Sequence, residues 1–186
     1  MTNRSYDLAG CSLLIQTELT KPYIYIYRVS SVLNRDIVSY GKKHLFDGSI
    51  ETCWNSEQGT PQHVLVEFEA PVCIHEIHIQ FQGGFAGKDT RLVDSTRNAD
   101  ICPLHPADNN RLQTFELPES ERLVSRKRIK IQFASSTDFY GRIIVYALDF
   151  VGLLAEPNAD PTSASSASLP AESDDAAVAS DTIVII

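Results

Sequence analysis

Strict alternation of apolar and polar residues is the feature that most constrains the fold of this chain. Three segments alternate in this way, namely His63–Glu69, Ile77–Gln82 and Arg128–Phe133. Successive side chains of a strand point to opposite faces, so each segment reads as a strand with one buried face and one solvated face. The segment Ile143–Val151 is apolar on both faces, which predicts a central strand.

Weaker signals fill the rest of the central region. Gln113–Leu117 predicts a short strand, and Gly83–Asn110 is long for a plain connection. We expect that stretch to contain a short strand near Ala99–Cys102 or to form a functional loop. No segment shows a sustained helical period with caps. Short strands separated by Gly, Pro, Asn and Asp predict an all-β sandwich or jelly roll.

Composition divides the chain after Gly152. Residues 153–186 contain six acids, no Lys or Arg and no aromatic residue. Such a segment buries too little apolar surface to offset its ordering entropy, so we expect a disordered acidic tail. Residues 28–152 are the predicted folded domain, and residues 1–27 are a poorly defined N-terminal arm. Within the arm, Tyr23–Tyr27 alternates like a strand but is also consistent with a loosely attached segment.

Charge and cysteine content exclude several classes of protein. The 16 bases and 18 acids of residues 1–152 nearly cancel, which argues against direct nucleic-acid binding. No apolar run approaches the roughly 18–20 residues of a membrane helix, so we expect no membrane span. Four cysteines without a C-x-x-C pair lack the common zinc and redox spacings. The segment ahead of the apolar run Leu8–Ile15 has no net positive charge, so we expect an intracellular protein without a secretory signal.

Lys43–Trp54 (KHLFDGSIETCW) is the most informative local segment. Asp47 can accept backbone hydrogen bonds within its own turn, Gly48 permits a left-handed backbone, and Thr52 can return a hydroxyl to the loop. One interpretation is a stapled turn. The other is a calcium loop in which Asp47, Thr52 and nearby carbonyls supply oxygen ligands.

Motifs of catalysis and cofactor binding are missing from the sequence. Gly83–Lys88 lacks the first glycine of a phosphate loop, and Asp89 stands where that loop needs Ser or Thr. His75 and His78 are three residues apart, which in a strand places them on opposite faces. No G-x-S-x-G motif occurs. We therefore expect a protein that is not an enzyme and that has no cofactor.

Two further motifs allow both a structural and a functional interpretation. Arg128 and Lys130 lie on the polar face of a predicted strand, which is either a solvated face or an electropositive patch for an acidic partner. Phe150–Leu154 is similar to the Leu-x-x-Leu-Leu helix by which coregulators dock on nuclear receptors. Its place in a predicted strand and the glycine at 152 oppose that helix.

Longer stretches resemble known families. KHLFDGSIETCWNSEQG resembles the opening loop of discoidin-like domains (the coagulation factor five/eight C-terminal type), and LDFVG is similar to their closing strand. Ser30–Gly59, Gln80–Phe85 (QFQGGF), DNNRLQTF and TDFYGRIIVYAL together resemble a small family of testicular orphan nuclear receptor-associated proteins. This resemblance spans about residues 28–152. It implies a galactose-binding-like jelly roll of two antiparallel sheets, with loops gathered at one end.

The same resemblance implies a function. A member of this family is expected to be a non-enzymatic module of the nucleus and cytoplasm that binds an orphan nuclear receptor and represses its transactivation. The simplest hypothesis is that docking blocks the receptor's binding to DNA. The turn Asp138–Gly141 is equally well interpreted as one whose aromatic rings cap the core. The candidate contact or loop-shaping residues are Gln82, Gly83, Gly84, Phe85, Asp138, Phe139, Tyr140 and Arg142.

Relatives of this fold leave two alternatives, a small-ligand module for a glycan or calcium and a structural subunit of a larger intracellular assembly. Calcium-binding members commonly have acids where this chain has Ser49 and Ala147, which disfavours calcium. Phe85 is the candidate for a sugar platform. Extracellular members join their two ends by a disulfide, whereas Cys11 is the only early cysteine here and none lies near Gly152.

Overall fold

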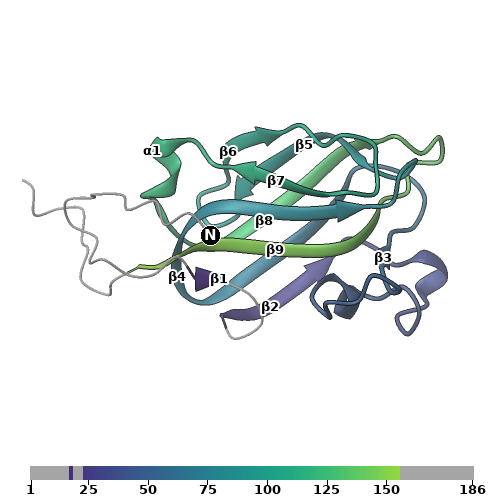
Figure 1. Cartoon of the computed structure of the whole chain (residues 1–186), viewed down its shortest axis with the longest axis horizontal. Coiled ribbons are helices and arrows are strands. Elements are labelled where there is room, and N and C mark those ends of the chain that lie inside the picture. The colour runs from purple at the N-terminus through teal and green to yellow at the C-terminus, as the bar shows by residue number, and fades with distance from the viewer. Residues whose placement is uncertain (1–16, 19–22, 156–186) are drawn as a thin grey trace, which may run out of the picture.

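Strands form the framework of the structure, a computed structural model that describes residues 17–18 and 23–155 (Figure 1). Three short helices, η1 (Leu33–Arg35), η2 (Lys42–Leu45) and α1 (Glu119–Arg122), lie between them. No helix in this part of the chain is long and apolar enough to cross a membrane. The strands are β1 (Thr17–Glu18), β2 (Ile24–Val29), β3 (Trp54–Asn55), β4 (Gln62–Phe81), β5 (Gly87–Asp94), β6 (Ala99–Leu104), β7 (Leu112–Glu116), β8 (Ser125–Ser136) and β9 (Ile144–Leu154).

Strand β4 belongs to both layers of the sandwich. Its first half pairs antiparallel with β2 and β8, and its second half pairs with β7 and β9. The register with β8 shifts between Glu67 and Val72, and Pro71, which has no N–H to donate, lies in this gap. The two alternating segments predicted as separate strands are therefore halves of one bent strand.

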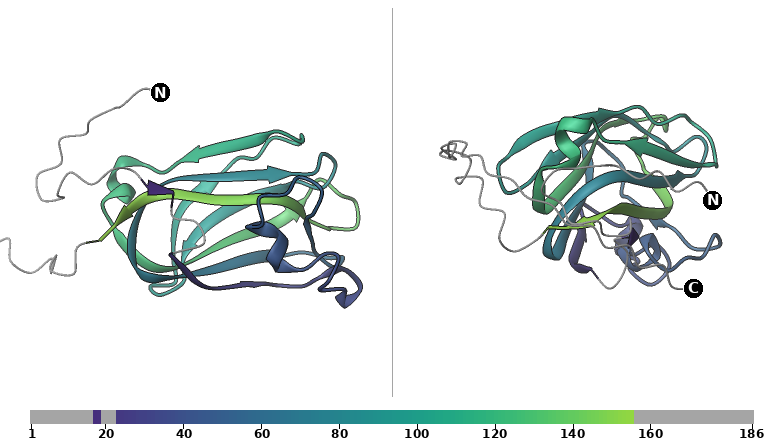
Figure 2. Two further views of the ribbon diagram at one scale, coloured as in Figure 1. Left: turned by 60° about the horizontal axis from the view of Figure 1, so that its bottom comes forward. Right: turned by 60° about the vertical axis from the view of Figure 1, so that its left-hand side comes forward.

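The two layers pack face to face over one core (Figures 1 and 2). One layer has the order β2-β4-β8-β5-β6, and the other has β7-β4-β9 with β1 and β3 paired to the outer edge of β9. Phe68 contacts Phe150 across the layers with ring centroids 5.7 Å apart, and Phe81 contacts Phe133 at 5.9 Å. Burying each such ring stabilises the fold by about 1.5–3 kcal/mol, so the alternating faces hold the layers together.

Several boundaries differ from those expected. The sandwich begins at β2, ahead of Arg28, because Ile24–Val29 pairs with β4 and packs against the core. Strand β5 occupies part of the stretch interpreted as a loop. Its alternation is interrupted at Asp89, whose φ of 46° is left-handed. The predicted strand near Ala99–Cys102 is present as β6. Most of the N-terminal arm and the tail from residue 156 lie outside the described residues.

Strand β9 also decides the interpretation of Phe150–Leu154. These residues continue β9, with Phe150 fully buried and Leu153 buried. A docking helix must expose its apolar residues on one face. The segment Phe150–Leu154 is therefore part of the core sheet and not a docking helix.

Candidate functional site

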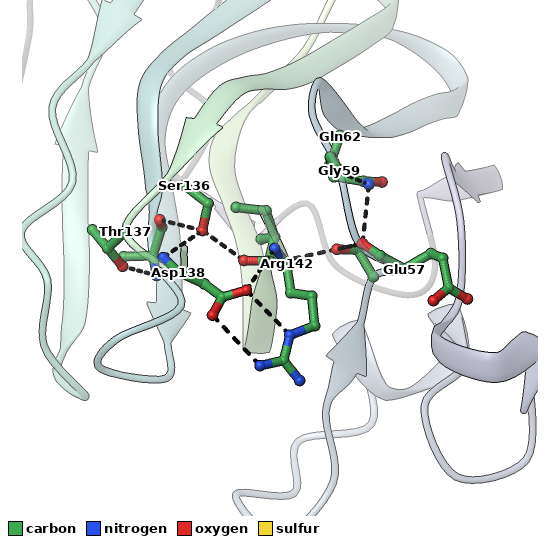
Figure 3. A network of polar contacts seen from close by, with 10 residues as sticks. Glu57, Gly59, Gln62, Ser136, Thr137, Asp138 and Arg142 are labelled. Atoms are coloured by element: carbon green, nitrogen blue, oxygen red, sulfur yellow. Dashed lines mark hydrogen bonds and ion pairs between the residues drawn. The ribbon is translucent and has the colours of Figure 1, made fainter. Parts of the chain in front are cut away.

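The turn between β8 and β9 is held by a closed set of hydrogen bonds around Asp138 (Figure 3). Asp138 Oδ2 accepts bonds from the Arg142 backbone N–H at 3.0 Å and from its Nε–H at 3.1 Å. Ser136 Oγ accepts the Asp138 N–H at 3.0 Å and donates to the Arg142 carbonyl at 2.6 Å. The Gly141 N–H donates to the Asp138 carbonyl at 3.0 Å. These bonds fix the backbone of the turn.

The charge of Asp138 is stabilised in this turn. Partial burial raises the pKa of Asp138, but the hydrogen bonds and positive charge of Arg142 lower it by more, so the net shift is downward. The guanidinium of Arg142 then lies over the Phe85 ring, with its Cζ 4.8 Å from the ring centroid. This cation–π contact connects the β8–β9 turn to the turn that contains Phe85.

A second loop supports the same turn from beneath. Gly141 has a φ of 79°, and a Cβ there would lie 3.1 Å from the backbone of Gly59. The Gly59 N–H donates to the Tyr140 carbonyl at 2.8 Å. The buried amide of Gln62 donates to the carbonyls of Glu57 at 3.2 Å and Gly59 at 2.6 Å (Figure 3). The β8–β9 turn therefore rests on a loop that is itself anchored in β4.

Two aromatic rings project from this anchored turn into solvent. Phe139 is 94% exposed and Tyr140 is 57% exposed, and the two rings meet edge to face with centroids 5.3 Å apart. The interpretation that these aromatics cap the core is wrong, because the Phe139 ring is almost fully exposed and the Tyr140 ring is more than half exposed. Exposed apolar rings on a fixed backbone are a feature of surfaces that bind other molecules.

The turn Gln82–Phe85 lies beside the β8–β9 turn. Phe85 accepts a backbone bond from Ile144 at 3.2 Å, and Gln82 Oε1 accepts the hydroxyl of Tyr146 at 3.1 Å. The N–H groups of Gly83 and Gly84 donate to the side chains of Asn110 and Asp108. The structure thus brings all eight sequence-predicted residues to one end of the sandwich. Phe85 is half-buried beneath Arg142 and is not a free tip.

Sequence reasoning missed part of this surface. Ile37 and Val38 are 68% and 71% exposed in the loop after η1. Asp36 Oδ1 accepts the Val38 N–H at 3.1 Å, and the Asn34 N–H donates to Glu57 Oε2 at 3.0 Å, which ties this loop to the one beneath Tyr140. Two adjacent apolar residues in a segment without alternation were the available signal. We call the side chains of Ile37, Val38, Phe85, Phe139, Tyr140 and Arg142 the loop surface.

The Asp47 loop has the geometry of a stapled turn. Asp47 Oδ2 accepts the Thr52 hydroxyl at 2.7 Å and lies 2.9 Å from His44 Nδ1, while Oδ1 accepts the Ser49 N–H at 2.9 Å. Partial burial raises the pKa of Asp47, and these hydrogen bonds lower it by more. Both carboxylate oxygens are used within the loop. Across residues 17–18 and 23–155, no three His, Cys, Asp or Glu side chains are arranged to hold a metal ion.

Comparison with known proteins assigns the chain to a family. A protein of Danio rerio named nuclear receptor 2C2-associated protein is 50% identical over 128 residues, which cover 67% of this chain and 89% of that protein. The chain belongs to the nuclear receptor 2C2-associated protein family. This confirms the family resemblance predicted from the sequence. No protein-family model matches the chain.

Comparison with solved structures confirms the fold of this member of the family. The family 32 CBM from C. perfringens NanJ, in complex with galactose, matches with a TM-score of 0.60 at 15% identity, covering 74% of this chain and 99% of that one. An F5/8 type C domain from Bacteroides fragilis matches with a TM-score of 0.60 at 14% identity, covering 75% and 98%. The predicted discoidin-like, galactose-binding-like jelly roll is correct. At these identities the likeness concerns the fold alone.

Proposed function

We propose that this chain is a non-enzymatic module of the nucleus and cytoplasm that binds an orphan nuclear receptor through the loop surface and represses its transactivation. The observation that carries the proposal is the exposure of Phe139 and Tyr140 on a hydrogen-bonded turn. The name of the related Danio rerio protein supports a nuclear receptor as the partner.

The geometry suits a protein interface. Burying the ring of Phe139 contributes about 1.5–3 kcal/mol to binding, which is the scale of an interface hot spot. The backbone that presents the ring is already fixed by Asp138 and Gly59, so little conformational entropy is lost on docking. Ile37 and Val38 are a second pair of exposed apolar side chains, on the loop whose Asn34 donates to Glu57.

Repression follows from occlusion in this proposal. The module docks on the receptor and covers its DNA-binding surface, so receptor bound to the module cannot bind DNA. The near-neutral net charge of residues 1–152 gives the module itself little electrostatic affinity for the phosphate backbone. Its effect on transcription therefore depends on contact with the receptor.

A gel-shift titration tests the proposal. Saturating wild-type protein is expected to raise the receptor concentration needed for half-saturation of the DNA. The double variant Phe139→Ser/Tyr140→Ser should abolish this effect without unfolding the chain, because both side chains are exposed. Leu112→Ser, at a 56% exposed position on β7, is the matched control and should behave like the wild type. Unchanged receptor–DNA affinity with wild-type protein refutes occlusion.

A glycan is the second candidate ligand, because the exposed ring of Phe139 could stack on a sugar. Phe85 is less suitable as a platform, since Arg142 covers its ring and is itself held by Asp138. A rise in melting temperature with galactose that disappears in Phe139→Ser favours the glycan. A flat melting temperature across galactose concentrations supports the protein partner.

A further inference from the structure

The outer face of the β2-β4-β8-β5-β6 layer carries a row of two cations around an apolar residue. Arg28 of β2 lies opposite Leu65 of β4, and Leu65 lies opposite Lys130 of β8. The neighbours Val64 and Ile131 are buried in the core, so Leu65 and Lys130 point outward. We call Arg28, Leu65 and Lys130 the basic strip.

The cations of this strip have no anionic partner in the part of the chain that the structure describes. The adjacent Arg128 is neutralised by Glu67, with Nη2 and Oε2 2.8 Å apart. Arg28 and Lys130 make no ion pair among residues 17–18 and 23–155. Partial burial and the nearby charge of Lys130 both lower the pKa of His63, so this ring adds little charge at neutral pH. The strip is therefore positive and lacks compensation.

The chain also contains a segment of the opposite, negative charge. Beyond Ala155 it has six acids and no base, with the densest group at Glu172, Asp174 and Asp175. The segment is attached at the bend of β4, the strand that carries Leu65, because the Ala155 N–H donates to the Pro71 carbonyl at 2.9 Å. Opposite charges on one chain attract at the high effective concentration that the linkage provides.

The distance to be crossed fits the length of chain available. Leu65 is six residues from Pro71 along β4, which is about 20 Å at the rise of a strand. Glu172 is seventeen residues beyond Ala155, and a random-coil linker of that length spans about 20–25 Å. Effective concentration is highest where the linker length matches the span. A linker of seventeen residues is therefore long enough for the acid cluster to reach the strip.

We propose that the acidic segment Glu172–Asp181 binds the basic strip of its own chain. Its carboxylates neutralise Arg28 and Lys130, and the segment covers the half-buried Leu65. In this state the strip is closed to acidic segments of other proteins. An acidic partner must displace the segment before it can bind this face.

Zero-length carbodiimide cross-linking of the full chain, read by mass spectrometry, tests the proposal because it joins lysine amines to carboxylates in direct contact. Lys130 is expected to link to Glu172, Asp174 or Asp175 in the monomer, and the yield should fall at about 0.5 M salt through screening. Lys88, an exposed lysine on β5, is the matched control and should link far less. Arg28→Gln should reduce the Lys130 link about two- to fivefold, the range for one surface ion pair.

Three results overturn the proposal. Equal yields at Lys88 and Lys130 mean that the tail has no preferred position. Links found only between two chains mean that a second copy occupies the strip. A Lys130 link that is insensitive to salt and to Arg28→Gln means that charge does not hold the segment there.

Discussion

Replacing Asp138 with asparagine tests whether one carboxylate holds the β8–β9 turn. The Asp138 side chain is 10% exposed and accepts three hydrogen bonds from Arg142, of which the longest, from the guanidinium to Oδ1, is 3.4 Å. A hydrogen bond to a charged group contributes about 1.5–3 kcal/mol, and asparagine keeps one neutral acceptor. We therefore expect Asp138→Asn to lower the free energy of unfolding by about 1–2 kcal/mol. In a domain of this size that equals roughly 3–6 °C in melting temperature.

The loss should depend on pH with a defined sign. The pKa of Asp138 is lowered in the folded protein, so its contribution is present above the unfolded value near 3.9 and is lost as pH falls through the folded value. The difference between wild type and variant is thus constant from about pH 7 to 5 and shrinks below about pH 4.

Urea unfolding followed by the fluorescence of Trp54, the single tryptophan, measures both effects. Asp100→Asn is the matched control, because the Arg91–Asp100 pair is 60% and 59% exposed and contributes at most about 1 kcal/mol. Equal losses in the two variants, or a loss for Asp138→Asn that persists unchanged in strong acid, refute the reasoning.

Three other predictions concern the rest of the described structure. Arg126→Met removes a buried cation that faces the buried Asp94 and the partly exposed Glu121, and it should cost about 3–5 kcal/mol in urea unfolding. Arg128→Met, at an exposed pair, should cost about 1 kcal/mol or less, and similar losses in the two variants contradict this. Gly141→Ala should lower the melting temperature more than Gly48→Ala, as measured by calorimetry. Both positions have a positive φ, but only at Gly141 would the added Cβ lie against other backbone atoms. Calcium should not raise the melting temperature, because the hydrogen bonds of the loop use both Asp47 oxygens; a rise that disappears in Asp47→Asn contradicts this.

The strands were largely predictable because burial of alternate side chains is a local property of the sequence. His63–Glu69 and Arg128–Phe133 needed only their own residues to be recognised, and both are strands. The continuity of β4 was not predictable, since it depends on which partners pair on each side of Pro71. Strand β5 was missed because the left-handed backbone at Asp89 interrupts its alternation.

The residues of the site were predicted from the sequence, but their arrangement in space was not. Turn-forming residues and the family resemblance selected Gln82–Phe85 and Asp138–Arg142, and the structure places them side by side. The sequence did not indicate that the β8–β9 turn packs against Gly59, about eighty residues earlier, or that Phe139 is exposed. No local pattern encodes such a contact.

Hydrogen exchange of the full chain, alone and bound to the receptor, tests most directly whether the loop surface is where the protein works. The proposal predicts that the receptor slows exchange of the amides in 137–142 and 82–85 and leaves the β5–β6 hairpin unchanged. Slowed exchange confined to α1 or to the β5–β6 hairpin, with these two turns unaffected, would contradict the account.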